Sequence, residues 1–262
     1  MEINNILAHA VETGDKKRYD YAICQGCNVN AAVSAINMQQ ASSWQREGFT
    51  TITPLALAIM QNNTEMLEYL LRDGADLTQP IKTDQITYTN ALALATIRAS
   101  HQTYERIFKE SNQEMIAKAA IEFKKEEIPV AHVLVCGYIP ELTSAESTAR
   151  LGQYLDRGLE VEQKDRHGYN LMMNAARVGN LDAIILLVQH GGDLTEKYPD
   201  KEKTIRDFII NADGTLYWQK HENEQDRQKI EQIEQIYQNR QQAKATRNSP
   251  VQTAIKATRH TR

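Results

Sequence analysis

The chain has 262 residues, which is enough for one or two domains with a sizeable core. Hydrophobic residues make up 41% but aromatic residues only 6%, and Gly (12) and Pro (6) are scarce, which argues against a turn-rich β-sandwich and favours helices packed by aliphatic side chains. The net charge is −4, but it is unevenly distributed. Residues 235–262 hold six basic and no acidic side chains, so the rest of the chain carries −10. If positive charge has a function in this protein, we expect that function in the C-terminal tail.

The N-terminus gives no sign of export or membrane insertion. Residues 1–20 have no basic region at their start and no long apolar run, so we expect no secretory signal peptide. No stretch is apolar for long enough to predict a transmembrane helix. The cysteine count is three, an odd number in a chain too large to need disulfides, which favours a reducing compartment and a cytoplasmic site of action.

The first predicted unit is a helix–turn–helix over residues 6–30, "ILAHAVETGDKKRYDYAICQGCNVN". Gly14 and Asp15 mark the turn between its helices, and Gly26 ends the second helix. Residues 31–50 then lengthen the connector to the next unit and are interpreted as an insertion.

The clearest unit covers residues 53–78, "TPLALAIMQNNTEMLEYLLRDGADLT". Its apolar residues have helical spacing in two runs, and Gly74 stands where a helix end needs a left-handed residue. The same pattern returns without a gap in residues 168–197, where Gly191 takes the place of Gly74. Repetition of whole units indicates a scaffold built from internal repeats.

Fainter copies fill the remaining chain. The segment 89–112 keeps its apolar positions but has Ser111 in place of the glycine, and 114–137 predicts two helices that end at Gly137. Residues 148–168 predict a good second helix, whose first helix must come from the short, Pro-containing segment 139–147, so this unit looks truncated. Residues 203–214 are similar to the start of a final unit.

These motifs resemble the ankyrin repeat, through "TPLALA" and "LLRDGAD" in one unit and "NAARVGN" and "LVQHGGD" in another. The resemblance implies an all-α solenoid of six or seven helix–turn–helix units, some degenerate, over residues 1–214. Apolar residues at helical spacing predict an amphipathic helix over 215–240 that caps the last unit. Residues 241–262 are polar and basic without an apolar period and are predicted to be disordered.

No motif indicates catalysis. Cys24 and Cys27 have the spacing of a redox or zinc motif, but a zinc site needs two further ligands and no second such pair exists. The histidines form no metal-binding motif, and no nucleophile elbow, phosphate-binding loop or dinucleotide fingerprint is present. We therefore expect a protein that is not an enzyme, with no catalytic residue, metal or cofactor.

The resemblance implies that a partner protein binds the concave face of the solenoid. By register, the variable surface positions are Glu12, Thr13, Ile52, Met60, Gln61, Thr89, Ile97, Arg98, Arg166, His167, Tyr169, Arg177 and Val178. Gln61, Arg98, His167, Tyr169, Arg177 and Val178 are the predicted binding residues, since Tyr and Arg often anchor interfaces. Trp44, in the polar insertion, either packs on the repeats or contacts the partner.

Other hypotheses concern the tail and the wider role. The basic tail is a solvated chain, a targeting signal, or a segment that binds nucleic acid or anionic lipid. The degenerate repeats and the Gln and Asn content resemble ankyrin proteins that intracellular bacteria deliver into the host cytosol. The alternatives to a binding module are an enzyme with an unrecognised site in the insertion or the C-terminal region, and a scaffold that self-assembles through the 215–240 helix.

Overall fold

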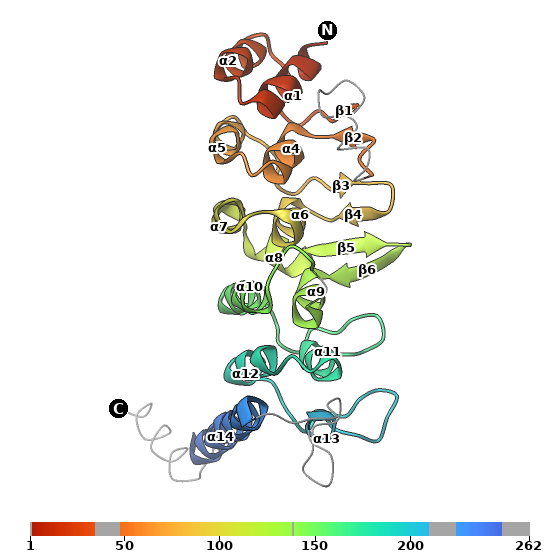
Figure 1. The fold of residues 1–262 in the computed structure, drawn as a ribbon, viewed down its shortest axis with the longest axis vertical. Coiled ribbons are helices and arrows are strands. Elements are labelled where there is room, and N and C mark those ends of the chain that lie inside the picture. Colours follow the sequence, from red (N-terminus) through yellow and green to blue (C-terminus); the bar gives the residue numbers. More distant parts are fainter. Residues whose placement is uncertain (1, 35–47, 138, 210–223, 248–262) are drawn as a thin grey trace, which may run out of the picture. The chain divides into compact units, whose positions relative to one another are not determined.

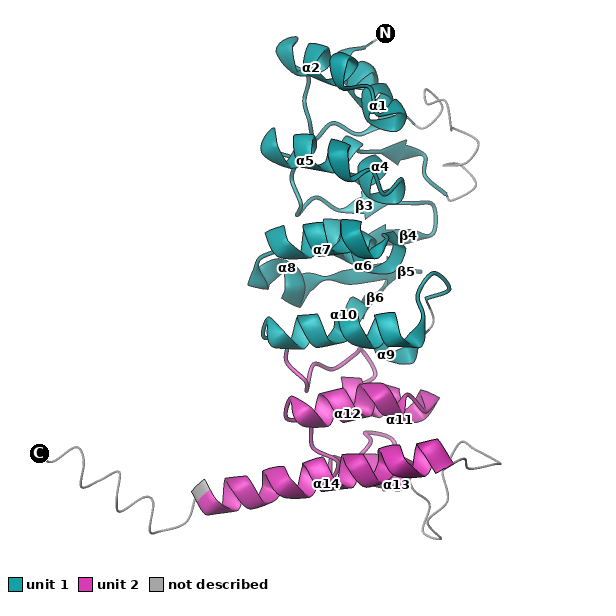
Figure 2. Ribbon diagram, turned by 60° about the vertical axis from the view of Figure 1, so that its left-hand side comes forward, with its two compact units in different colours: residues 1–159 teal, residues 160–262 magenta. Residues whose placement is uncertain are grey.

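The structure, a computed structural model, describes residues 2–34, 48–137, 139–209 and 224–247. The chain divides into two compact units, Met1–Leu159 and Glu160–Arg262, which are described separately below (Figure 2). The sequence predicts one array over residues 1–214, whereas this division falls inside that range. It follows a helix end at Gly158, where φ is 91° and the chain continues as an irregular connector.

Unit 1 is built from stacked pairs of antiparallel helices. The first helices of the pairs contact one another in chain order, and each packs against its own second helix (Figure 1). The pairs are α1 (Ile3–Thr13) with α2 (Lys16–Cys24), α4 (Pro54–Met60) with α5 (Thr64–Arg72), α6 (Ala91–Arg98) with α7 (His101–Glu110), and α9 (Val130–Cys136) with α10 (Ser144–Asp156).

Short polar side chains determine where these helices begin. The Thr53 hydroxyl accepts a hydrogen bond of 3.1 Å from the Ala56 N–H, and Pro54 follows as the first residue of α4. Such a cap stabilises a helix by about 1 kcal/mol. The turn between α1 and α2 contains Gly14 at φ 68°, a left-handed conformation that glycine adopts without steric cost. The turn predicted at Gly14 and Asp15 is therefore present.

The predicted helical repeat fold is present, but two small antiparallel sheets mean that it is not purely α-helical. One joins β1 (Val33–Ser34) to β2 (Thr51–Ile52), and the other has the order β3 (Ile81–Lys82), β4 (Ile86–Tyr88), β5 (Ala120–Phe123), β6 (Glu126–Pro129). The strands lie in the connectors between helix pairs, where neighbouring hairpins come close enough to share backbone hydrogen bonds. Each strand has only two to four residues, too few for a clear alternating pattern.

The sequence predicts that residues 114–137 form one unit of two helices, but the two helices found there are not paired with each other. This segment contains most of α8 (Gln113–Lys118), then the β5–β6 hairpin, then α9. The predicted helix end at Gly137 is present, with φ 66°, but α9 is the first helix of the next pair. The segment 139–147 therefore supplies no first helix. Thr143 instead begins α10 through a capping box with Glu146.

A buried arginine from α10 binds the carbonyl groups at the end of α6, whereas α1 ends instead at Gly14. Arg150 on α10 is 3% exposed, and its guanidinium donates to the carbonyls of Ala95 (3.2 Å), Thr96 (2.7 Å) and Ala99 (2.9 Å). It also lies 4.3 Å from the ring centre of Tyr104. Helix ends leave carbonyls without partners, and a cation there is favourable. Burial lowers the pKa of Arg150 from its ordinary value.

Unit 2 contains α11 (Leu171–Val178), α12 (Leu181–Gln189), α13 (Ile205–Ile209) and α14 (Glu224–Arg247). Helices α11 and α12 form a pair, and α14 packs along α12. Ile233 of α14 is buried, the Lys229–Asp182 ion pair (2.8 Å) joins α14 to α12, and the Arg206–Glu234 ion pair (2.7 Å) joins α14 to α13. A helix therefore covers α12, as a capping element would.

The bounds of this helix differ from the predicted ones. It begins at Glu224 and continues to Arg247, so residues 241–247, expected to be disordered, are helical. The reason is that helices propagate readily through Gln, Ala, Lys and Arg once begun. Residues 215–223 of the predicted helix and residues 248–262 of the predicted tail lie outside the described residues.

Candidate partner-binding surface

Four predicted binding residues of unit 2 lie together, around a loop that one carboxylate organises. Asp165 accepts hydrogen bonds from the backbone N–H groups of His167 (2.8 Å) and Tyr169 (3.0 Å) through Oδ1. Its Oδ2 accepts from the Asn174 amide on α11 at 2.9 Å. The loop is closed at Gly168, whose φ of 80° favours glycine. Asp165 thus fixes the loop to the first helix of its repeat.

Aromatic rings continue from this loop into the interior of unit 2. The ring of Tyr169 lies 6.3 Å from that of His167 and 5.8 Å, edge-on, from that of Tyr198. Tyr198 in turn packs on Phe208 at 4.3 Å and donates from its hydroxyl to the Met173 carbonyl at 2.9 Å. The half-buried Tyr169 therefore packs against the buried Tyr198, which is itself fixed by its own contacts.

The exposed edge of this cluster carries a cation and an apolar side chain. The Arg177 guanidinium lies 5.0 Å from the ring centre of Tyr169 and donates to the Asn174 side-chain carbonyl at 3.3 Å. Val178 follows at the end of α11 and is 37% exposed. The Tyr169 hydroxyl bonds to the Asp200 carboxylate, and this hydrogen bond raises the pKa of Tyr169. We call His167, Tyr169, Arg177 and Val178 the Tyr169 cluster.

The other predicted binding residues lie elsewhere. In unit 1, Gln61 donates to the Glu12 carbonyl at 3.1 Å and so joins two successive repeats, while Arg98 pairs with Glu141 at 3.4 Å. Ile52, one of the variable positions, is only 1% exposed and belongs to the core. Trp44 lies outside the described residues.

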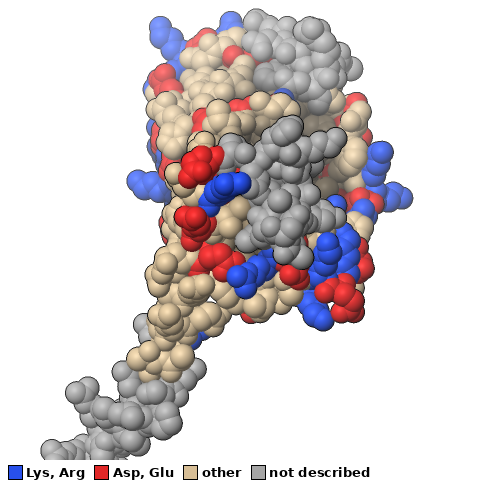
Figure 3. Space-filling model, turned by 60° about the horizontal axis from the view of Figure 1, so that its bottom comes forward, with Lys and Arg blue, Asp and Glu red and all other residues tan. Residues whose placement is uncertain are grey.

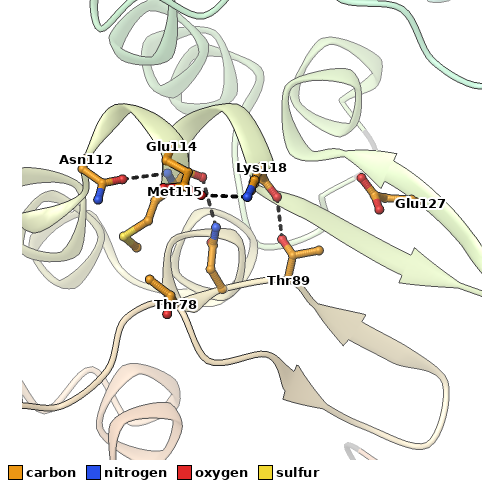
Figure 4. A pocket seen from close by; sticks show the side chains of 8 residues that line it. Thr78, Thr89, Asn112, Glu114, Met115, Lys118 and Glu127 are labelled. Atoms are coloured by element: carbon orange, nitrogen blue, oxygen red, sulfur yellow. Dashed lines mark hydrogen bonds and ion pairs between the residues drawn. The ribbon is translucent and has the colours of Figure 1, made fainter.

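Sequence reasoning missed a polar hollow in unit 1 of about 650 Å³. It opens between α6, α8 and the connector before β3 (Figure 4), and its described lining is Thr78, Thr89, Asn90, Asn112, Glu114, Met115, Lys118 and Glu127. The Asn90 amide donates to the Met115 carbonyl (3.0 Å), and the Thr89 hydroxyl donates to that of Lys118 (2.7 Å). These hydrogen bonds hold α8 against the start of α6. The polar side chains that line the hollow therefore have a structural role.

A pair of carboxyl groups in unit 2 was also not predicted. The fully buried Asn170 amide donates to Glu162 (2.7 Å) and to Glu196 (2.6 Å), which come from successive connectors. Burial and the neighbouring Glu196 raise the pKa of Glu162, and Lys164 pairs with Glu196 at 3.2 Å. Asn170 caps α11, so the pair serves to position that cap.

The remaining chemistry of the described residues is sparse. Cys24, Cys27 and Cys136 are free thiols, and burial raises the pKa of Cys27, which makes it a poorer nucleophile. The described part of the chain contains no cluster of three or more His, Cys, Asp or Glu side chains suited to a metal ion. Figure 3 shows acidic and basic side chains interspersed over one face.

Comparison with known proteins identifies one segment. Residues 50–79 match the family model of the ankyrin repeat, and they contain β2, α4 and α5. No curated protein matches the chain. Among the described helices, none is both long and apolar enough to cross a membrane.

Proposed function

We propose that the protein is a non-enzymatic binding module and that the Tyr169 cluster contacts its protein partner. Ankyrin repeats commonly mediate protein–protein interaction, and residues 50–79 are one. The observation that supports this site is that four residues selected by repeat register lie within one exposed cluster on a fixed loop and helix. Tyrosine and arginine are the side chains that most often dominate binding energy.

The arrangement also suits binding energetically. Ordering a flexible side chain costs about 0.5–1.5 kcal/mol on association. Tyr169 and Arg177 already hold each other in the free protein, and Asn174 and Asp200 hold them from either side. Much of this cost is therefore met during folding, which favours recognition of a partner on this surface.

A pull-down with the full chain tests the proposal. The bait is compared with a Tyr169→Ala/Arg177→Ala double variant and with Gln189→Ala, a control at an exposed position at the end of α12. The lysate comes from a candidate host cell, because the sequence resembles effectors that act in the host cytosol. We expect mass spectrometry to find proteins retained by the wild type and the control but lost from the double variant. Equal retention by all three would refute the site.

A further inference from the structure

Arg177 differs from four other basic side chains of unit 2. Lys164, Lys197, Arg206 and Lys229 each form an ion pair with a carboxylate of unit 2. Arg177 is exposed and forms no ion pair with any described residue; its polar contact is the 3.3 Å bond to Asn174. One of its five N–H donors is therefore engaged, at a long distance.

The guanidinium is nevertheless held in place. Tyr169 lies 5.0 Å from it, and Asn174 binds one end. Asn174 is fixed by Asp165, and Tyr169 by Asp200 and the ring of Tyr198. A planar cation that is rigid but has free donors matches a carboxylate, which accepts two parallel hydrogen bonds.

We propose that Arg177 binds an aspartate or glutamate side chain of the partner protein, with an adjacent apolar residue of the partner packed on Val178. This inference rests on the proposed function and specifies the chemistry of the partner. Val178, the next residue and the last of α11, is 37% exposed and offers an apolar surface to the same partner segment. The recognised segment is therefore an acidic residue next to an apolar one.

The surroundings favour a carboxylate over a phosphate. A phosphate carries about −1.5 to −2 charges at neutral pH and is usually met by several cations. Here two nearby cations are already engaged, since Arg166 donates to the His167 ring at 3.0 Å and Lys201 lies over the rings of Tyr198 and Phe208. The Asp165 and Asp200 carboxylates flank Tyr169 and would repel a doubly charged group more strongly than a singly charged one.

Selection from a displayed peptide library on the immobilised full chain tests the inference. We expect the selected peptides to share an aspartate or glutamate beside an apolar residue. Fluorescence anisotropy then measures the Kd of one such peptide and of its Asp→Asn or Glu→Gln form. Loss of a charge-assisted pair predicts that the amide peptide, or Arg177→Gln, weakens binding about tenfold. Arg177→Lys keeps the charge but not the paired donors, so a smaller loss is expected, and Gln189→Ala is the control.

Three results would overturn the inference. The first is peptides without acidic enrichment, the second is an unchanged Kd in Arg177→Gln, and the third is a clear preference for phosphopeptides. Thermal melts establish that the variants are folded. If the library fails while the pull-down retains a partner through the cluster, this inference falls and the proposed function stands. If both fail, both fall.

Discussion

Replacing Arg150 with alanine tests how unit 1 ends a helix without glycine. In the wild type, three carbonyls at the end of α6 accept from this guanidinium at 2.7–3.2 Å. Each of these hydrogen bonds contributes about 1 kcal/mol to stability. We therefore expect the free energy of unfolding to fall by about 3 kcal/mol. This is a large part of the total free energy of unfolding of a typical protein, which is about 5–15 kcal/mol.

Arg157, the residue directly after α10, supplies the control. Arg157 also lies over an aromatic ring, that of Phe108 at 5.4 Å, but it is exposed and donates to one carbonyl, that of Ser111. Arg157→Ala should cost only about 1 kcal/mol. Arg150→Lys should fall between the two, because an ammonium group cannot reach all three carbonyls.

Urea unfolding followed by circular dichroism measures these differences by linear extrapolation. The reasoning about the α6 end is wrong if Arg150→Ala is no more destabilising than Arg157→Ala. It is also wrong if Arg150→Lys is as stable as the wild type, because the paired donors would then be irrelevant.

Three further predictions concern other contacts. Because the pKa of Glu162 is raised in the folded state, the folded protein keeps a proton that the unfolded chain releases. The free energy of unfolding should therefore fall as the pH rises above 4.5, the ordinary pKa of a glutamate, and urea titrations of Glu162→Gln should lack this decrease. Lys124 and Lys125 have φ of 52° and 66°, so an Asn-Gly pair there should raise the free energy of unfolding by about 1–2 kcal/mol; no gain in urea titrations would contradict this. Ile233→Ala should destabilise unit 2 by about 2–4 kcal/mol in urea, against little change for the exposed Gln232→Ala.

The turns and helix ends marked by glycine were the most predictable part of the fold. Gly14 and Gly137 act through local geometry, so their roles are visible in sequence. The β5–β6 hairpin was not predicted because its turn consists of Lys124 and Lys125. These residues carry no turn signal, yet they adopt the positive φ that normally selects Asn or Gly. Helical and alternating patterns also overlap in this short stretch.

The binding residues were partly predictable for a related reason. Repeat register placed His167, Tyr169 and Arg177 on the surface, because it depends only on spacing. Register could not reveal that Asn174 and Tyr198 hold them, since those contacts depend on packing. It also placed Ile52 on the surface, whereas the residue pairs with Val33 in a sheet the repeat pattern does not predict.

The packing of α14 on α12 has a consequence for synthesis of the chain. In unit 1, each helix pair closes between residues near one another in sequence, so a pair can form soon after it is made. Helix α12 packs on α11 and also on α14, which begins only at Glu224 and whose Arg240 donates to the Val188 carbonyl at the end of α12. The side of α12 that α14 covers therefore stays exposed during translation until this late segment emerges, and apolar surface exposed in that interval is what a chaperone would bind.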